Sequence, residues 1–379
     1  MSVARSVPGG LVARVENTGA SKISIELVDG EVVETLFAEV LVDGAWQRVY
    51  VWSLIFCGNS RWTTQDVAPG ESAEFGVWIT DPLATHRVGL EISVDGGDPV
   101  FAYSEPRGVE QRRAFLASGW DGLRATTARA ARPFGHSLDS YFALVDGAPA
   151  EISIDAETSA EFERGDAHAP DRRYLVRAAF GDPRVERDPR ARDPRAIARS
   201  IRRVERDGDC TFVGQITTDV FVELYFRADD ELAARRAVRA HLDRPDLSLI
   251  SHDDPDGKIE RLLLVPTWRD RRCMANLDVV EQLEGLGDVG AKSRPIEHFA
   301  ILRSDSDVDG FVAAARELGY EAKRWEDEDL APESDERWMH VVRDDPATWD
   351  AVNAASIELT ELAERFGGVY DGWETVIAR

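Results

Sequence analysis

The stretch Ile-Glu-His-Phe-Ala-Ile-Leu, residues 296–302, opens the most regular part of this 379-residue sequence. It is nearly continuous in apolar residues, which is typical of a strand that lies centrally in a sheet and is covered on both faces. Helix N-cap residues at 304–307 follow, and apolar residues then recur at helical spacing as far as Gly319, a typical C-terminal stop. The pattern predicts a strand followed by a helix.

The sequence from residue 320 onward predicts two strands, a helix and a last strand. In order, these elements are expected at residues 320–325, 337–343, 346–366 and 373–378. The acidic segment 326–336 joins the two strands as a loop. Asp345 and Pro346 favour a helix start, because proline loses no hydrogen bond in the first turn. The complete order, strand, helix, strand, strand, helix, strand, is typical of ferredoxin-like (βαββαβ) domains.

The residues that close this segment resemble a known family. Tyr-Asp-Gly-Trp at 370–373 follows a helix that ends Leu-Ala-Glu-Arg-Phe at 362–366, and Phe311 leads to the turn Glu-Leu-Gly-Tyr at 317–320. These features are similar to the regulator of ribonuclease activity B family. Members of that family bind and restrain the endoribonuclease of the RNA degradosome and catalyse no reaction. The resemblance therefore implies a protein-binding inhibitor at residues 291–379.

Aromatic rings and carboxylates in this segment are the candidate partner-binding residues. They are Tyr370, Asp371, Trp373 and the loop residues Glu326, Asp327, Glu328 and Asp329. We expect the acidic loop to steer a basic protein partner and Trp373 to anchor it, and a Trp373 that packs in the core agrees equally well with the sequence. Residues 296–379 contain 21 acidic and 8 basic side chains. This charge would repel RNA, so direct nucleic-acid binding is not expected.

The first hundred residues predict an all-β sandwich. Short alternating runs between residues 11 and 104 are separated by turn sequences at intervals typical of this class. Glu-Asn-Thr-Gly at 16–19 and Ala-Pro-Gly-Glu-Ser at 68–72 are similar to immunoglobulin-like accessory domains of bacterial proteins. We expect this module at residues 1–106, followed by a linker helix at 107–135.

Residues 136–290 predict an α+β module. It begins with two strands joined at Asp146-Gly147, a tight turn, and continues with strands and helices up to a last expected strand at 259–265 and a short helix at 276–287. Tyr-Phe at 141–142, Val-Gly-Gln-Ile-Thr at 213–217 and Leu-Leu-Val-Pro at 263–266 resemble the bacterial domain of unknown function 695. No activity follows from that resemblance.

Residues 172–206 form the one basic region, with twelve arginines and five acids. One interpretation is a surface that faces phosphate or a partner. The other is a solvated segment whose arginines pair with neighbouring carboxylates, an arrangement that is common and contributes little.

Composition limits the remaining possibilities. The net charge of −25 disfavours a general nucleic-acid binder. The widely spaced Cys57, Cys210 and Cys273 form no zinc or redox motif, and they indicate reduced, buried thiols. No apolar run approaches the ~20 residues of a membrane span, so a soluble cytoplasmic protein is expected.

No catalytic, cofactor or metal motif stands out. The seven histidines never occur at metal-ligand spacing, and neither a glycine-rich phosphate loop nor a nucleophile motif is present. His298 lies in an apolar run and is expected to be a core or edge residue rather than a base. We therefore expect a non-catalytic, protein-binding regulator without cofactors. The alternatives are an enzyme with a site between the middle and C-terminal modules, or a structural adaptor.

Overall fold

The computed structural model describes residues 2–7, 10–28, 36–42, 45–49, 62–78, 83–122, 138–164, 173–181, 194–218, 221–244, 247–303, 308–325 and 337–379. The chain forms two compact units. One consists of Met1–Ala114 and Arg129–Val265, and the other of Phe115–Ala128 and Pro266–Arg379. Several sheets with helices confirm the prediction of a multidomain protein of mixed α and β structure.

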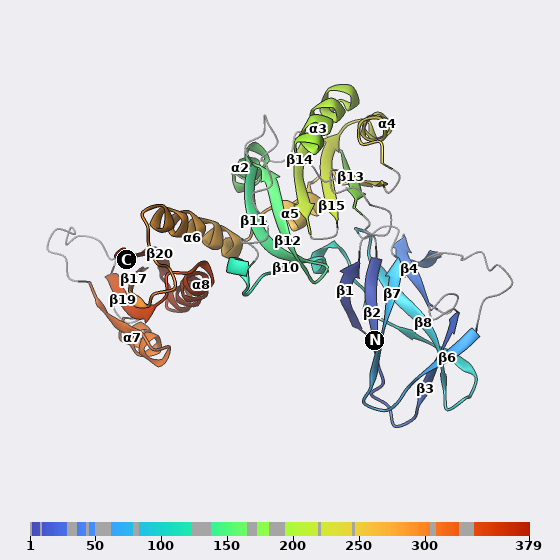
Figure 1. Cartoon of the computed structure of the whole chain (residues 1–379), viewed down its shortest axis with the longest axis horizontal. Helices are drawn as coiled ribbons and strands as arrows, with labels where there is room; N and C mark the ends of the chain where they lie inside the picture. Colours follow the sequence, from blue (N-terminus) through green and yellow to red (C-terminus); the bar gives the residue numbers. More distant parts are fainter. Residues whose placement is uncertain are drawn as a thin grey trace. The chain divides into compact units, whose positions relative to one another are not determined.

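Two sheets make up the N-terminal part of the first unit (Figure 1). The smaller sheet has the order β1-β2-β7, with β1 (Ser2–Val7), β2 (Gly10–Glu16) and β7 (Ser72–Trp78). The larger has the order β5-β4-β8-β3-β6, with β9 paired to β8. Its strands are β3 (Ile23–Val28), β4 (Leu36–Val42), β5 (Ala45–Val49), β6 (Trp62–Val67), β8 (His86–Val94) and β9 (Pro99–Tyr103). Ile25, Val88 and Leu90 are fully buried in this part.

A sheet with the order β10-β11-β12-β14-β15-β13-β16 forms the middle of the chain. Its strands are β10 (Arg113–Phe115), β11 (Leu138–Val145), β12 (Ala148–Asp155), β13 (Tyr174–Phe180), β14 (Cys210–Thr217), β15 (Val222–Ala228) and β16 (Ser248–Asp253). The helices are α2 (Ala156–Arg164), α3 (Pro194–Gly208), α4 (Glu231–His241) and α5 (Lys258–Leu264). Phe212, Leu224 and Phe226 pack with residues of α3 and α4 in one core.

The prediction of a strand at residues 259–265 is wrong, because these residues form helix α5. The carboxylate of Asp254 accepts hydrogen bonds from the backbone N–H groups of Ile259 and Glu260 at 3.1 and 3.3 Å, which satisfies the first turn of a helix. Leu263 and Leu264 are buried, and the helix ends before Pro266. A short apolar run that contains leucines occurs in strands as well as in helices. Here the cap that Asp254 provides favours the helix.

The expected linker helix at 107–135 also differs from the structure over the described part of that segment. A 3-10 turn, η1 (Val109–Gln111), and strand β10 occupy its beginning, and residues 123–135 lie outside the described residues. Arg112 is 4 % exposed and its guanidinium reaches the carboxylates of Asp146 and Glu223, which holds the backbone against the sheet.

The second unit contains one antiparallel sheet with the order β18-β19-β17-β20. The strands are β17 (Arg294–Leu302), β18 (Glu321–Arg324), β19 (Arg337–Asp345) and β20 (Val369–Thr375), and the helices are α6 (Trp268–Gly285), α7 (Val308–Glu317) and α8 (Trp349–Arg365). Phe311, Leu359 and Leu362 of α7 and α8 pack on Ala300, Met339 and Val341 of the sheet. The helices α7 and α8 therefore cover one face.

Three details of this unit differ from the sequence-based expectation. Strand β17 is central, but it is buried on one face only: His298 and Ala300 are buried, whereas Glu297, Phe299 and Ile301 are half-buried on the other. The last strand begins at Val369, four residues earlier than expected. Helix α6 begins at Trp268 instead of residue 276, because Thr267 and Asp270 form a capping box.

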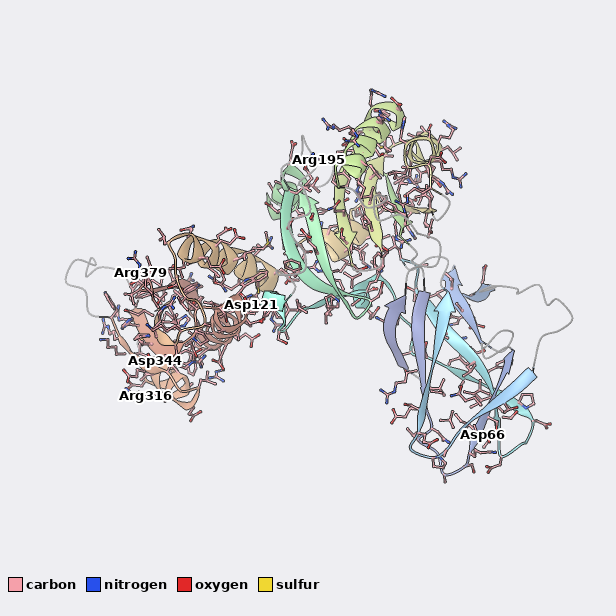
Figure 2. The ribbon with its side chains drawn as sticks, in the orientation of Figure 1. Asp66, Asp121, Arg195, Arg316, Asp344 and Arg379 are labelled. Carbon is pink, nitrogen blue, oxygen red and sulfur yellow. The ribbon has the colours of Figure 1, made fainter. Side chains whose placement is uncertain are left out.

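The segment 115–122 belongs to this unit because it packs against the start of α8. Trp120 is 1 % exposed, and its ring centroid lies 6.3 Å from that of Trp349. The carboxylate of Asp121, labelled in Figure 2, accepts from the N–H groups of Trp349 and Asp350 at 3.2 Å each. The Asp350 carboxylate in turn accepts from the N–H of Trp120 at 2.8 Å. These reciprocal bonds satisfy N–H groups at the helix start.

Candidate functional site

The side chain of Tyr370 is directed into the interior, not toward solvent. It is 5 % exposed, and its hydroxyl lies 2.8 Å from Nδ1 of His298 and 3.4 Å from Oγ of Ser356. Burial raises the pKa of Tyr370 above its usual range. The guanidinium of Arg272 on α6 lies 4.7 Å from the centre of the tyrosine ring. Tyr370 thus joins the sheet to α6 and α8.

Trp373 faces the same side of the sheet as Tyr370. It is half-buried, and its Nε1 donates a hydrogen bond to Oδ1 of Asn276 on α6 at 2.9 Å. A bulge in the pairing of β17 with β20, between Phe299 and Ala300, brings both aromatic residues to the helix side. Asp371, the residue at the bulge, is exposed. Glu326, Asp327, Glu328 and Asp329 lie outside the described residues.

A buried polar cluster surrounds these aromatic residues. Asn276 donates to Oδ1 of Asn353 at 2.8 Å, and His298 is 1 % exposed. Burial, together with the positive charge of Arg343, lowers the pKa of His298 to about 3. Its imidazole is therefore neutral at physiological pH, and its enclosure makes it a core residue rather than an accessible base, as the sequence led us to expect.

The side of the sheet opposite α7 and α8 carries an aromatic cluster that sequence reasoning missed. We call this side the open face. The ring of Phe299 stacks on that of His340 at 5.5 Å and 27°, and the ring of Trp325 meets both edge-on, at 5.8 and 4.9 Å. Nε2 of His340 lies 2.6 Å from Oε2 of Glu297. The signal in the sequence was the alternation of Glu297, Phe299 and Ile301 between the buried positions.

Two shallow grooves adjoin the sheet. One, of about 650 Å³, follows β18 and is lined by Arg316, Lys323 and His340 among others. The second, of about 350 Å³, lies between α6, α8 and β20, where Trp268, Arg272 and Val369 contribute to its wall.

A second set of shifted titratable groups lies in the middle sheet, where each group has a charged or hydrogen-bonded partner. Glu223 accepts hydrogen bonds from Arg112 at 2.7 Å, from Arg177, and from the Tyr225 hydroxyl. Burial alone would raise the pKa of Glu223, but the charges of Arg112 and Arg177 outweigh it and hold the pKa well below its usual range. These groups are at most 4 % exposed, and they have a structural role.

The described residues contain no group of three or more potential metal-ligating side chains. Within the described part of the chain, no helix is both long and apolar enough to span a membrane. Cys210 and Cys273 are buried, and Cys57 lies outside the described residues.

The sequence of the second unit matches a known family. Residues 274–375 match the family model described as Regulator of ribonuclease activity B. The regulator of ribonuclease activity B match includes all four strands of the sheet, α7, α8 and the greater part of α6. It confirms the resemblance of the C-terminal segment and agrees with a regulatory role without catalysis. No curated protein matches the chain.

Proposed function

We propose that the second unit binds an endoribonuclease and restrains it, without a reaction of its own. The observation that carries this proposal is the match of residues 274–375 to the regulator of ribonuclease activity B family. The internal groups of the unit support it. His298 and Tyr370 are enclosed and bonded to each other, and such groups are poorly placed to act on a substrate.

Topology and charge support a finer assignment. We propose a ferredoxin-like module, because β17, α7, β18, β19, α8 and β20 follow the order βαββαβ. The partner is a protein rather than RNA, because 21 acidic and 8 basic residues in 296–379 give a field that repels phosphate. The carboxylates of Asp371 and of residues 326–329 would bind a basic region of a cytoplasmic nuclease and occlude it.

For the rest of the chain we propose an immunoglobulin-like sandwich at 1–106, a linker at 107–135 and a module similar to domain of unknown function 695. That module was expected at 136–290, but its residues from 266 onward lie in the second unit. One observation favours an adaptor role for the sandwich. Phe101 and Tyr103, which lie on the same side of β9, are 49 and 40 % exposed, and the guanidinium of Arg87 lies over the rings of Trp46 and Tyr103, 4.4 and 4.2 Å from their centres. Exposed apolar and aromatic residues on one sheet are typical of contact surfaces.

The test uses the whole chain as bait in lysate of the source cells, followed by mass spectrometry. Any endoribonuclease recovered is then purified and assayed for RNA cleavage with and without the chain. Capture of a nuclease whose cleavage slows in proportion to the added chain supports the proposal. Capture without any effect on cleavage, or no nuclease at all, contradicts it.

A further inference from the structure

Side chains on the open face form three rows that run across the strands. The register of the strands places Val369, Ile301 and Trp338 in one row. The next row contains Gly372, Phe299, His340 and Lys323, and the third contains Glu374, Glu297, Val342 and Glu321. An apolar row and an aromatic row therefore lie beside a row with three glutamates.

The glutamate row has an energetic cost in the absence of a partner. Glu297 and Glu374 are direct neighbours on β17 and β20, and like charges opposite each other destabilise a sheet. His340 interacts with Glu297, whereas Glu374 and Glu321 are exposed. Neighbouring strands lie about 4.8 Å apart, so the row spans roughly 14 Å. Cations distributed over that distance would relieve the repulsion.

The aromatic row offers a surface for a planar cation. Trp325 is 37 % exposed, and its edge-on contacts with Phe299 and His340 hold the ring in place. Nδ1 of His340 meets no hydrogen-bond partner among the described residues, although His340 is only 8 % exposed. A guanidinium group stacks on such rings and pairs with carboxylates at the same time, which an ammonium group does less well.

We propose that the open face is the docking surface for an arginine-bearing basic segment of a protein partner. The guanidinium groups stack on Trp325 and Phe299 and pair with the row formed by Glu374, Glu297 and Glu321. The identity of the partner as a ribonuclease rests on the proposed function above. RNA fits less well, because its phosphates would meet the glutamate row.

The full chain is titrated with hexa-arginine, hexalysine and a twelve-nucleotide polyuridine at one fixed salt concentration, because exposed charges are screened by salt. Wild type is expected to prefer hexa-arginine to hexalysine. Trp325→Ala should weaken hexa-arginine binding roughly two- to fivefold and remove the preference. Glu297→Gln should weaken both peptides, and Lys323→Glu, which extends the negative surface, should strengthen both.

Matched controls lie on the helix side of the same unit. Trp268 is 40 % exposed on α6, and Glu364 is exposed on α8, so Trp268→Ala and Glu364→Gln remove the same groups away from the open face. Peptide affinity should not change in either. Equal weakening by the control variants, or binding of the polyuridine that depends on Trp325, would overturn the proposal.

The same variants separate this inference from the proposed function. If the whole chain slows a ribonuclease and Trp325→Ala and Glu297→Gln slow it equally well, the regulatory function stands and the open face is the wrong surface. If wild type captures no ribonuclease while the peptide results hold, the docking surface stands and the ribonuclease assignment fails.

Discussion

Nε1 of Trp373 donates a hydrogen bond to Oδ1 of Asn276, 2.9 Å away, which ties the last strand of the sheet to α6. We expect Trp373→Phe to keep the packing and lose this bond, which would lower the free energy of unfolding by about 1 kcal/mol. Partner binding should persist. Urea denaturation of the full chain, with hydrogen exchange at the β20 amides, measures the first effect, and the ribonuclease assay measures the second.

The same substitution at an exposed tryptophan serves as the control for Trp373→Phe. Trp268→Phe removes an indole N–H from a residue that is 40 % exposed, and we expect almost no change in stability. If Trp373→Phe abolished nuclease binding at unchanged stability, Trp373 would be the anchor of the partner rather than a link to α6.

Burial of His298 predicts loss of stability in acid. Its pKa is lowered to about 3 in the folded state, whereas an unfolded histidine has a pKa of about 6.5. Below pH 6.5 the unfolded chain therefore binds a proton that the folded chain excludes. Stability should fall with pH toward 3 by as much as ~1.4 kcal/mol per pH unit from this residue alone. Comparison of wild type with His298→Gln at pH 7 and pH 5 by urea denaturation isolates the effect. A constant difference between the two proteins would contradict it.

The order of strands and helices from β17 to β20 was predictable from sequence, because the caps and the helical periodicity agree with each other. The exposure of β17 was not predictable, because Phe299 and Ile301 make the strand apolar on its second face as well. Among the described residues, α7 and α8 cover only the first face. An apolar run looks the same whether the second face meets a helix or solvent. The start of α6 was readable in principle from Thr267 and Asp270, the capping box.

The orientation of the candidate site residues depended on a feature that sequence does not reveal. Tyr370 and Trp373 are three residues apart, and in a regular strand they would point to opposite faces. The bulge beside Asp371 brings both to the helix side. The aromatic cluster of the open face depends on cross-strand register in the same way, because Phe299 and His340 become neighbours only when β17 pairs with β19.

The buried charges of the middle sheet predict a large cost for one substitution. Arg112→Met removes a cation that pairs with Asp146 at 2.8 Å and with Glu223 at 2.7 Å, both buried. Breaking a buried pair typically costs about 3–5 kcal/mol, because a charge stays buried without its partner. The matched control is Arg173→Met, whose pair with Asp253 is exposed and contributes little to stability. Urea denaturation followed by circular dichroism compares them. If both substitutions lowered the free energy of unfolding equally, burial of the Arg112 ion pairs would not determine their contribution to stability.

The contacts of α6 predict that a fragment limited to residues 296–379 is unstable. Nε1 of Trp349, a residue 2 % exposed, donates to the carbonyl of Cys273 on α6 at 3.0 Å, and Trp373 bonds to Asn276 on the same helix. Loss of α6 exposes the indole of Trp349 and leaves both donors without partners. We expect a fragment of residues 266–379 to exceed the shorter one in stability by at least about 3 kcal/mol. Tryptophan fluorescence during urea denaturation measures the difference. Equal midpoints would show that α6 is not part of the folding unit. If the fragment of residues 296–379 is unstable, as expected, its failure to bind a nuclease would reflect its unfolding. Such a failure would not contradict a regulatory function of the full chain.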